Sequence, residues 1–459
     1  MSPPPRARYR CRVTSGPETP VRGVPAGKPR FTPLEDRDPA PVPWLIALMT
    51  GINRHLILGA LMKLRGFDLP EADLARLRKA VQPGTAAFLG PAHPEFLTDW
   101  MIDKEISARC SPLMAHWASY EIVNASPLIR AFWLANNLIA NVPGGGGKAY
   151  SVAWARQGHG VLLHPEGTAT WQGERVAPLL PGIVDMAWAA AEAGAAGAAL
   201  NDAREVWLVP LVWQLRFRAD ASTGLEREIS HIERGLSLPT SGGALGERFG
   251  ALLCRLLLRQ CERLGLTSPE PRLAAGPTGY FAAQARALAE LQDMLAARYG
   301  PLDADVVRAQ FQIRKAIRER GQTDPDGVRL DRARLLELQR LTGLDPRLYD
   351  RSTLAQERIA EVLKRTRSSL LTRGFANVFS NTVPVAVAAR TVHVRVAEPI
   401  AVHTLLQSRR TTDPGMARAA LLAEHALRLQ HALDRLSAAL STFPGAAAID
   451  NPLHRAQTS

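Results

Sequence analysis

Short apolar runs alternate with stretches of helical periodicity between residues 67 and 218. The runs that predict strands are 86–89, 138–142, 161–164 and 206–213. Buried strands separated by amphipathic helices are typical of an α/β fold. We therefore expect an α/β domain at 67–218.

The pattern changes between residues 219 and 380, where long helices rich in Leu, Ala and Arg are separated by Gly and Pro. The helices predicted here cover residues 244–264, 279–299, 304–320, 331–343 and 353–372. No strand pattern interrupts them. We interpret residues 219–380 as a helical insertion in the α/β domain.

The strand pattern returns after this insertion. Val392, Val394 and Val396 alternate with polar residues, as in a strand with one buried face. Residues 381–405 are therefore expected to rejoin the sheet, and 413–440 to form a C-terminal helix. The predicted fold class is α/β, a mixed sheet flanked by helices with a large α-helical insertion.

Residues 44–66 are apolar and predict amphipathic helices that face a membrane. A transmembrane span needs about 20 apolar residues, whereas Arg54 and its neighbours place polar groups in the middle of this stretch. Residues 1–43 are rich in Pro and Arg and predict a flexible arm, without the apolar centre of a secretion signal. We expect a cytoplasmic protein that associates peripherally with the membrane.

Charge and composition narrow the class of partner. The chain has 56 Lys and Arg against 43 Asp and Glu, a formal charge of +13 that attracts acidic partners. The charge is spread along the chain and no nucleic-acid-binding motif is present, so we expect no nucleic acid and favour an anionic membrane surface or an acidic protein. The four cysteines lack the spacing of a metal site or a disulfide scaffold.

The first candidate for catalysis is His93. It follows a predicted strand and precedes Pro94, a residue suited to the first turn of a helix, so it lies where α/β sheets present functional groups. A neutral imidazole can act as general base, and Asp99 could fix its tautomer. Asp103, one helical turn later, is the second candidate for that role. A purely structural His-Pro turn is the alternative.

The second candidate is the turn after the predicted strand 161–164. Glu166 could accept hydrogen bonds from a hydroxylated substrate, Gly167 allows close backbone approach, and Thr168 completes the wall. These residues could also form a tight turn without a further role. His164, at the end of the strand, could either pack or line the site.

Together the two stretches resemble the glycerolipid acyltransferase family, typified by 1-acyl-glycerol-3-phosphate acyltransferase. That family carries N-H-x-x-x-x-D, then F-P-E-G-T-R-S, then a strand with V-P-[VIL]. The matching residues, in the same order, are His93 and Asp99, then Pro165-Glu166-Gly167-Thr168, then Val209-Pro210-Leu211. The resemblance covers about 84–215, and 385–405 resembles the family's closing strand.

The chain departs from the family pattern at several positions. Its acidic residue, Asp99, follows His93 by six residues instead of five, and the arginine of the Pro-Glu-Gly-Thr block is Ala169. The other phosphate-binding arginine is also missing. A glycine loop stands near that place and could cradle a phosphate with its N–H groups, or be a flexible turn; its residues are Gly144, Gly145, Gly146, Gly147 and Lys148.

The resemblance implies O-acyl transfer from a thioester to a hydroxyl of a lysophospholipid-like acceptor. His93 would be the base and Asp99 its orienting partner, with Glu166, Gly167 and Thr168 beside the acceptor. The donor would be acyl-CoA or acyl carrier protein, and no bound cofactor or metal is implied. The alternatives are an esterase or lysophospholipase on the same fold, and a basic membrane-binding module without catalysis.

Overall fold

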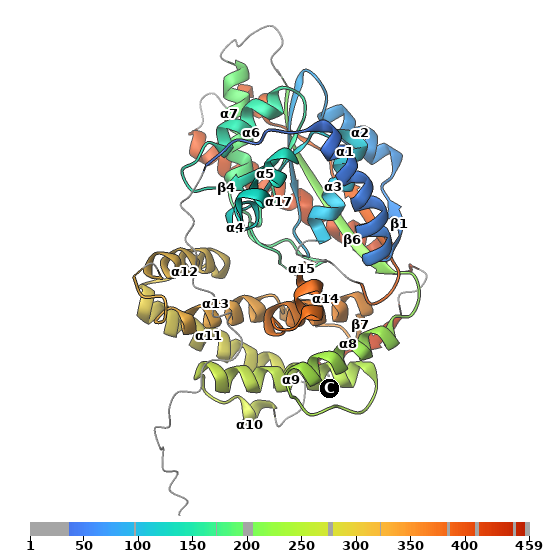
Figure 1. Cartoon of the computed structure of the whole chain (residues 1–459), viewed down its shortest axis with the longest axis vertical. Coiled ribbons are helices and arrows are strands. Elements are labelled where there is room, and N and C mark those ends of the chain that lie inside the picture. The colour runs from blue at the N-terminus through green and yellow to red at the C-terminus, as the bar shows by residue number, and fades with distance from the viewer. Residues whose placement is uncertain are drawn as a thin grey trace, which may run out of the picture.

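The computed structural model describes residues 36–95, 98–170, 172–195, 205–273, 279–321, 323–382, 386–408, 413–443 and 447–454. Most of the predicted arm at 1–43 lies outside these ranges. The described chain forms a domain built on a sheet and, packed beneath it in Figure 1, a layer of helices.

The centre of the first part is a mixed sheet of eight strands. They are β1 (Leu64–Asp68), β2 (Thr85–Pro91), β3 (Ala115–Ser119), β4 (Leu138–Asn141), β5 (Val161–Leu162), β6 (Glu205–Phe217), β8 (Arg390–Val396) and β9 (Ile400–Ala401). Their order is β1-β8-β6-β2-β5-β3-β4, with β9 paired to β6. β8 and β9 run antiparallel to β6, and the other pairs are parallel. The sheet is mixed and flanked by helices, as predicted.

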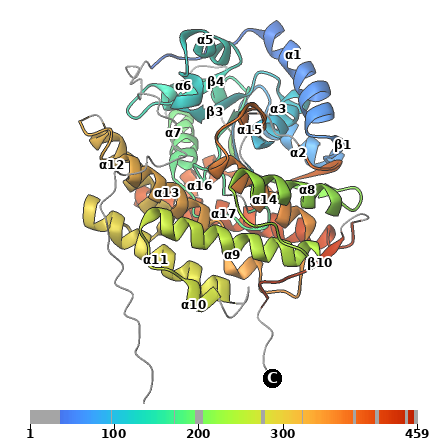
Figure 2. The ribbon, with the colours of Figure 1, turned by 60° about the horizontal axis from the view of Figure 1, so that its bottom comes forward.

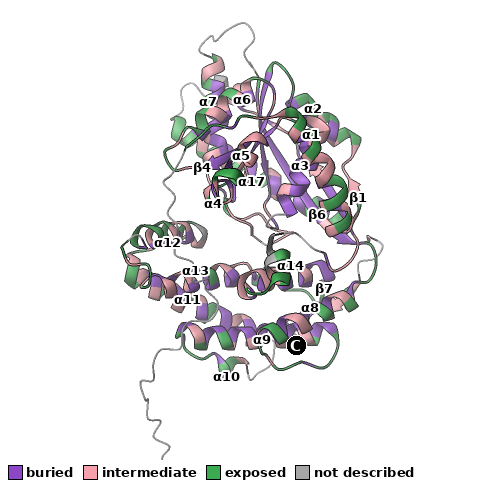
Figure 3. Ribbon diagram, in the orientation of Figure 1, coloured by how far each residue is buried: buried purple, intermediate pink, exposed green. Residues whose placement is uncertain are grey.

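Helices cover both faces of this sheet. One face packs on η1 (Asn53–Leu61, a π-helical segment), α2 (Glu71–Ala80) and α3 (Thr98–Cys110); the other packs on α6 (Gly147–Arg156), α7 (Gly182–Ala195), α16 (Val402–Ser408) and α17 (Pro414–Ala439). Successive residues of β2 point to opposite faces. Ala86 and Phe88 belong to one core, and Ala87 and Leu89 to the other, which explains why β2 is buried along its whole length. Figure 3 shows buried strands through the centre of the sheet.

The apolar segment near the N-terminus is helical but shorter than predicted. α1 (Pro43–Ile52) continues into η1, and β1 begins at Leu64, so the end of the stretch predicted as helix at 44–66 is a strand. This end of the stretch is a strand and not a helix because β1 pairs with β8, which is far away in the sequence. Within the described residues, Pro43–Leu61 is the one helical stretch long and apolar enough to cross a membrane, judged by length and composition alone.

A layer of helices separates β6 from β8 in the chain. It contains α8 (Ser222–Gly235), α9 (Leu245–Leu264), α10 (Glu270–Leu273), α11 (Tyr280–Tyr299), α12 (Val306–Arg320), α13 (Arg329–Thr342), the 3-10 turn η3 (Pro346–Leu348), α14 (Gln356–Leu370) and α15 (Phe375–Thr382). It has its own hydrophobic core. A short strand within it, β7 (Thr353–Ala355), pairs with β10 (Ala448–Asp450) near the C-terminus. Figure 2 shows these helices as one layer in front of the sheet.

The helical layer begins and ends at neighbouring strands. Phe217 of β6 is paired with Arg390 of β8, and Arg218 donates its N–H to the carbonyl of Ala389 (3.1 Å). Of the returning segment predicted at 381–405, β8 and β9 are strands, whereas the last residues belong to α16. The C-terminal helix α17 lies within a residue of the predicted 413–440.

Two further helices close the other edge of the sheet, where β3 and β4 lie. They are α4 (Tyr120–Val123) and α5 (Pro127–Ala135). Val123 packs there against Leu138 and Ala140 of β4. Since β2, β5, β3 and β4 are parallel, their carboxyl ends share one edge of the sheet, where crevices for ligands form in α/β folds.

Candidate active site

His93 lies in the loop that follows β2 at the carboxyl end of the sheet. The loop is fixed on both sides, since Ala92 donates its N–H to the carbonyl of Leu211 (3.0 Å) and Thr170 donates its N–H to the carbonyl of His93 (2.8 Å). The His93 side chain keeps 14% of its surface exposed. A substrate can therefore reach a side chain whose backbone is held in place.

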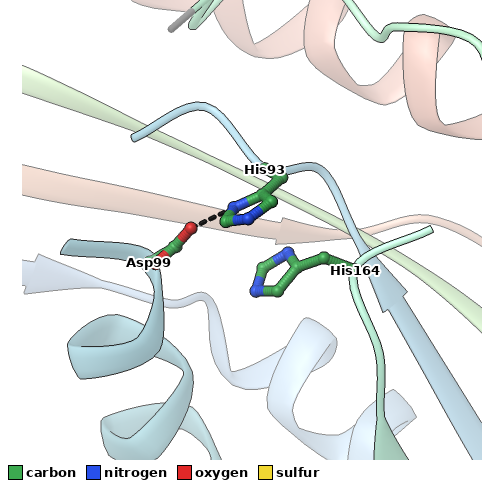
Figure 4. A group of neighbouring side chains, drawn as sticks. All are labelled: His93, Asp99 and His164. Carbon is green, nitrogen blue, oxygen red and sulfur yellow. Dashed lines mark ion pairs between the residues drawn. The ribbon is translucent and has the colours of Figure 1, made fainter. Parts of the chain in front are cut away.

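Asp99 contacts the His93 ring at Nδ1 through its Oδ2 atom (Figure 4). It sits in the first turn of α3, and its other oxygen accepts a hydrogen bond from the Trp100 N–H (2.6 Å). A carboxylate at Nδ1 favours the tautomer with hydrogen on that atom. The Nε2 lone pair of His93 then remains free to accept a proton. The structure thus brings together the two residues predicted as base and orienting partner.

Three polar residues of α3 form a row facing three histidines. Asp99, Asp103 and Ser107 are spaced by four residues, which places them on one face of a helix. Asp103 Oδ2 lies 2.9 Å from His164 Nε2, and Ser107 Oγ lies 3.0 Å from His116 Nε2. Asp103, the second candidate to orient His93, instead pairs with His164. The spacing in the sequence could have revealed this row, but the partner of each member depends on the fold.

The rings of His93 and His164 are stacked, with centroids 4.2 Å apart and planes inclined by 20°. Although burial alone would lower the pKa of His164, the Asp103 carboxylate raises it to about 9, and burial raises the pKa of Asp103 to about 6. At neutral pH these two groups form an ion pair. Burial lowers the pKa of His93 below 6.5, Asp99 opposes this shift, and the charge of His164 adds to it. His93 is thus neutral, as a general base must be.

The predicted acceptor wall, Glu166 to Thr168, lies beside this pair of histidines. Glu166 is buried, and its carboxyl oxygens make no well-formed hydrogen bond among the described residues, although the backbone N–H groups of Ala177 and His93 and the Thr170 hydroxyl lie near enough to favour its charged form. Burial raises its pKa to about 8, and its charge is close enough to affect His164. A buried polar group without a partner is costly. Glu166 is therefore a group that a bound hydroxyl could satisfy, while Thr168 is half-buried nearby in the chain.

Gly167 occupies a position that requires glycine. Its φ is +70°, in the left-handed region, and a Cβ atom there would lie 2.6 Å from Leu180 Cδ1 and 2.9 Å from Phe311 Cζ. Phe311 belongs to α12. The helical layer therefore packs directly onto the Pro-Glu-Gly-Thr turn, a contact that the sequence did not reveal.

A second contact joins the helical layer to the His93 loop. Lys364 of α14 donates hydrogen bonds to Glu95 Oε1 (2.7 Å) and Thr98 Oγ1 (2.9 Å). Glu95 is buried. Lys364 therefore ties α14 to the loop that carries His93.

The glycine loop lies farther along the same edge of the sheet. It follows β4, three strands from β2, which at a strand spacing of about 4.8 Å is roughly 14 Å away. In this loop Gly146, which lies between Gly145 and Gly147, donates its N–H to Asp36 Oδ2 (2.5 Å). Lys148 Nζ lies 3.3 Å from Asp185 Oδ2. Carboxylates of the chain itself occupy the groups that were predicted to hold a phosphate.

The described residues also include one group of side chains able to approach a metal ion. One ligand atom each of His93, Asp99 and His164 lie within 4.8 Å of one another. A metal bound there would compete with the contact of His93 with Asp99 and with that of His164 with Asp103. The proton-transfer chemistry described above uses the same atoms without such an ion.

Comparison with known proteins adds no family to this picture. No protein-family model matches the chain. No curated protein matches it either.

Proposed function

We propose that this protein is an O-acyltransferase of the glycerolipid acyltransferase kind. It moves a fatty acyl group from acyl-CoA or acyl carrier protein to a hydroxyl of a lysophospholipid-like acceptor in phospholipid synthesis. The observation that carries the proposal is the contact of His93 with Asp99 at the carboxyl end of β2. The neighbouring turn, which contains Glu166, supplies the second part of the motif.

The reaction needs one proton acceptor and no covalent enzyme intermediate. His93 Nε2 takes the proton of the acceptor hydroxyl while Asp99 stabilises the resulting imidazolium through Nδ1–H. The oxygen attacks the thioester carbonyl carbon, and a tetrahedral intermediate forms. Its collapse breaks the C–S bond, and His93 returns the proton to the departing thiolate. The products are an ester and a free thiol.

Glu166 supports the assignment of the acceptor side. Its buried carboxyl group makes no well-formed hydrogen bond among the described residues, and in its protonated form it can both donate and accept a hydrogen bond. A polyol such as a glycerol backbone offers both kinds of partner. Glu166 therefore orients the acceptor and keeps the reacting hydroxyl near His93.

The segment α1–η1 supports peripheral attachment to an anionic membrane on the cytoplasmic side. Trp44, Leu48 and Leu56 are exposed by 69%, 52% and 54%. The segment is anchored at its centre, because Asn53 donates to the carbonyl of Met101 (2.8 Å) and Arg54 pairs with Glu105 (3.0 Å). An apolar surface fixed to the domain in this way suits a helix lying in the membrane interface.

Transfer of a labelled acyl group tests the proposal. The purified protein is incubated with radiolabelled acyl-CoA and a panel of lysophospholipids, and lipid products and free thiol are measured together. We expect label in a diacyl lipid and one thiol released per ester formed. Label found only in free fatty acid would identify an esterase instead, and absence of thiol release with both acyl-CoA and acyl carrier protein donors would overturn the proposal.

A further inference from the structure

A pocket whose lining includes several charged residues opens next to the His93 loop, between the sheet and the helical layer. Its empty space is about 540 Å³ when the open solvent at its mouth is counted, and its wall includes Pro94, the ends of β6 and β8, and α14. Pro94 directly follows His93 in the chain, and adjacent Cα atoms are about 3.8 Å apart. The wall of the pocket therefore begins next to His93. A ligand group in this pocket can belong to the same molecule that reacts at His93.

Arg390 is the least satisfied cation of this pocket. It is 7% exposed, and its Nε and Nη2 atoms have no hydrogen-bond partner among the described residues. Its ion pair with Glu95 is long, at 3.9 Å. Since unpaired buried charges are strongly unfavourable, the pocket offers a buried guanidinium group to a negatively charged ligand.

Two other side chains of the wall add donors. Arg216 gives one hydrogen bond to Gln214 (3.0 Å), but its Nε atom has no partner. The Nε1 atom of Trp213 is also buried without a partner. Arg390, Arg216 and Trp213 thus present several N–H groups that phosphoryl oxygens can accept.

The acidic residues of the wall already have cationic or backbone partners. Glu95 binds Lys364 (2.7 Å), Glu361 binds Arg358 (2.8 Å), and Glu357 accepts from the N–H of Phe217 (2.6 Å). The fourth, Glu174, pairs with Arg351 (3.1 Å). The second oxygens of Glu95 and Glu357 make no hydrogen bond among the described residues and form only long ion pairs, 3.9 Å to Arg390 and 4.0 Å to Arg216. Those two oxygens can accept from a hydroxyl or ammonium group that accompanies the phosphate.

We propose that this pocket binds the phosphodiester headgroup of the acceptor lipid. Arg390, Arg216 and Trp213 contact its phosphoryl oxygens, and Glu95 and Glu357 contact its terminal hydroxyl or ammonium group. A phosphodiester carries a single negative charge, which suits a wall that mixes arginines with carboxylates better than the nearly doubly charged phosphate of a monoester. The assignment of the pocket to the acceptor rests on the proposed function, because the donors, coenzyme A and the carrier-protein arm, also contain phosphate groups.

Binding of soluble headgroups tests the pocket independently of catalysis. Isothermal titration with glycerophosphoglycerol and with glycerol 3-phosphate should show tighter binding of the phosphodiester to the wild-type protein. Arg390→Gln should weaken the binding of glycerophosphoglycerol by about tenfold or more, since it removes hydrogen bonds to a charged group. Lys148→Ala, which removes a cation at the glycine loop, should leave it unchanged. A larger loss with Lys148→Ala than with Arg390→Gln would overturn the proposal.

A milder variant guards against a folding defect. Trp213→Phe removes one unpartnered N–H and keeps an aromatic ring. Because Trp213 is buried, the smaller ring should lower the melting temperature slightly, but the protein should stay folded at the titration temperature while the binding of glycerophosphoglycerol weakens. Unchanged binding in both this variant and Arg390→Gln would overturn the proposal. Titration with coenzyme A distinguishes the source of the phosphate, because a loss confined to coenzyme A would assign the pocket to the donor and overturn the acceptor assignment. Headgroup binding that depends on Arg390, in a protein without acyl transfer, would support the pocket and reject the proposed function.

Discussion

The His164 ring lies against the His93 ring and holds a positive charge beside the candidate base. The charge comes from the ion pair of His164 with Asp103 (2.9 Å), and it lowers the pKa of His93. The glycerolipid acyltransferase family has Phe at the position of His164. The stacked pair therefore changes the pH range in which His93 can accept a proton.

Replacing His164 with Phe should move the pH profile. Because the positive charge lowers the pKa of His93, its removal should raise that pKa, and the acidic limb of kcat/KM should shift to higher pH by up to about 1 unit. Asp103→Asn should shift the limb in the same direction, since without the carboxylate the pKa of His164 falls. A limb that stays in place in both variants would contradict the electrostatic role of His164.

His93→Ala should reduce acyl transfer by about two to four orders of magnitude, the usual share of a general base. Asp99→Asn should cost less than this but far more than Asp103→Asn, because Asp99 contacts His93 directly and Asp103 acts through His164. Steady-state rates, together with circular dichroism to verify folding, provide the measurement. A folded His93→Ala variant within threefold of the wild-type rate would eliminate His93 as the base.

Glu95→Gln should destabilise the protein in a pH-dependent way. Burial alone would raise the pKa of Glu95, but the positive charges of Lys364 and Arg390 lower it more strongly. The pKa of Glu95 in the folded protein is therefore below 4.5. The carboxylate then contributes stability above about pH 4.5, and this contribution is lost as the pH falls through the folded-state pKa. At pH 7 the free energy of unfolding should drop by about 3 kcal/mol, the cost of breaking a buried ion pair.

Urea unfolding at pH 7 and at acidic pH measures this difference. The gap between wild type and Glu95→Gln should narrow as the pH falls. Glu319→Gln, in the exposed pair Lys315–Glu319, is the matched control and should change the stability little. A gap that stays constant with pH would show that the ion pair with Lys364 does not stabilise the fold.

Membrane attachment should depend on the exposed side of α1–η1. The triple substitution Trp44→Ser, Leu48→Ser and Leu56→Ser should weaken binding to vesicles with anionic lipid by about tenfold or more, since it removes apolar area from the interface. Met416→Ser, at an exposed apolar residue of α17 (67% exposed), should leave binding unchanged. Equal sedimentation of all three proteins with vesicles would place the attachment surface elsewhere.

Local patterns predicted most elements of the fold but not those that depend on distant pairing. Predicted strands at 86–89 and 206–213 correspond to β2 and β6, because buried apolar runs are recognisable from composition. β1 and β3 were missed: β1 is a short segment between charged residues that pairs with β8, and β3 pairs with β4 and β5. Their conformation is determined by partners far away in the sequence.

The candidate site shows the same division. His93, Asp99 and Glu166 were identified from motifs, and the structure places His93 in contact with Asp99. The roles of Lys364 and Arg390 could not be predicted, because both residues are far from the His93 loop in the sequence. Lys364 lies in α14 of the helical layer, and Arg390 begins β8 after that layer. Periodicity marks Lys364 as part of a basic helix, and only the fold brings it to Glu95.

The paired strands β6 and β8 fix the two ends of the helical layer at one place, through the bond from Arg218 to Ala389. In polymer terms the layer is a closed loop, and lengthening such a loop costs only about 0.6 kcal/mol for each doubling of its length. Residues added to exposed connections between its helices should therefore cost the sheet little stability. The helices that touch the His93 and Glu166 loops, α12 and α14, must keep their geometry for the site to stay assembled, so added residues are best accommodated in the connections between the other helices.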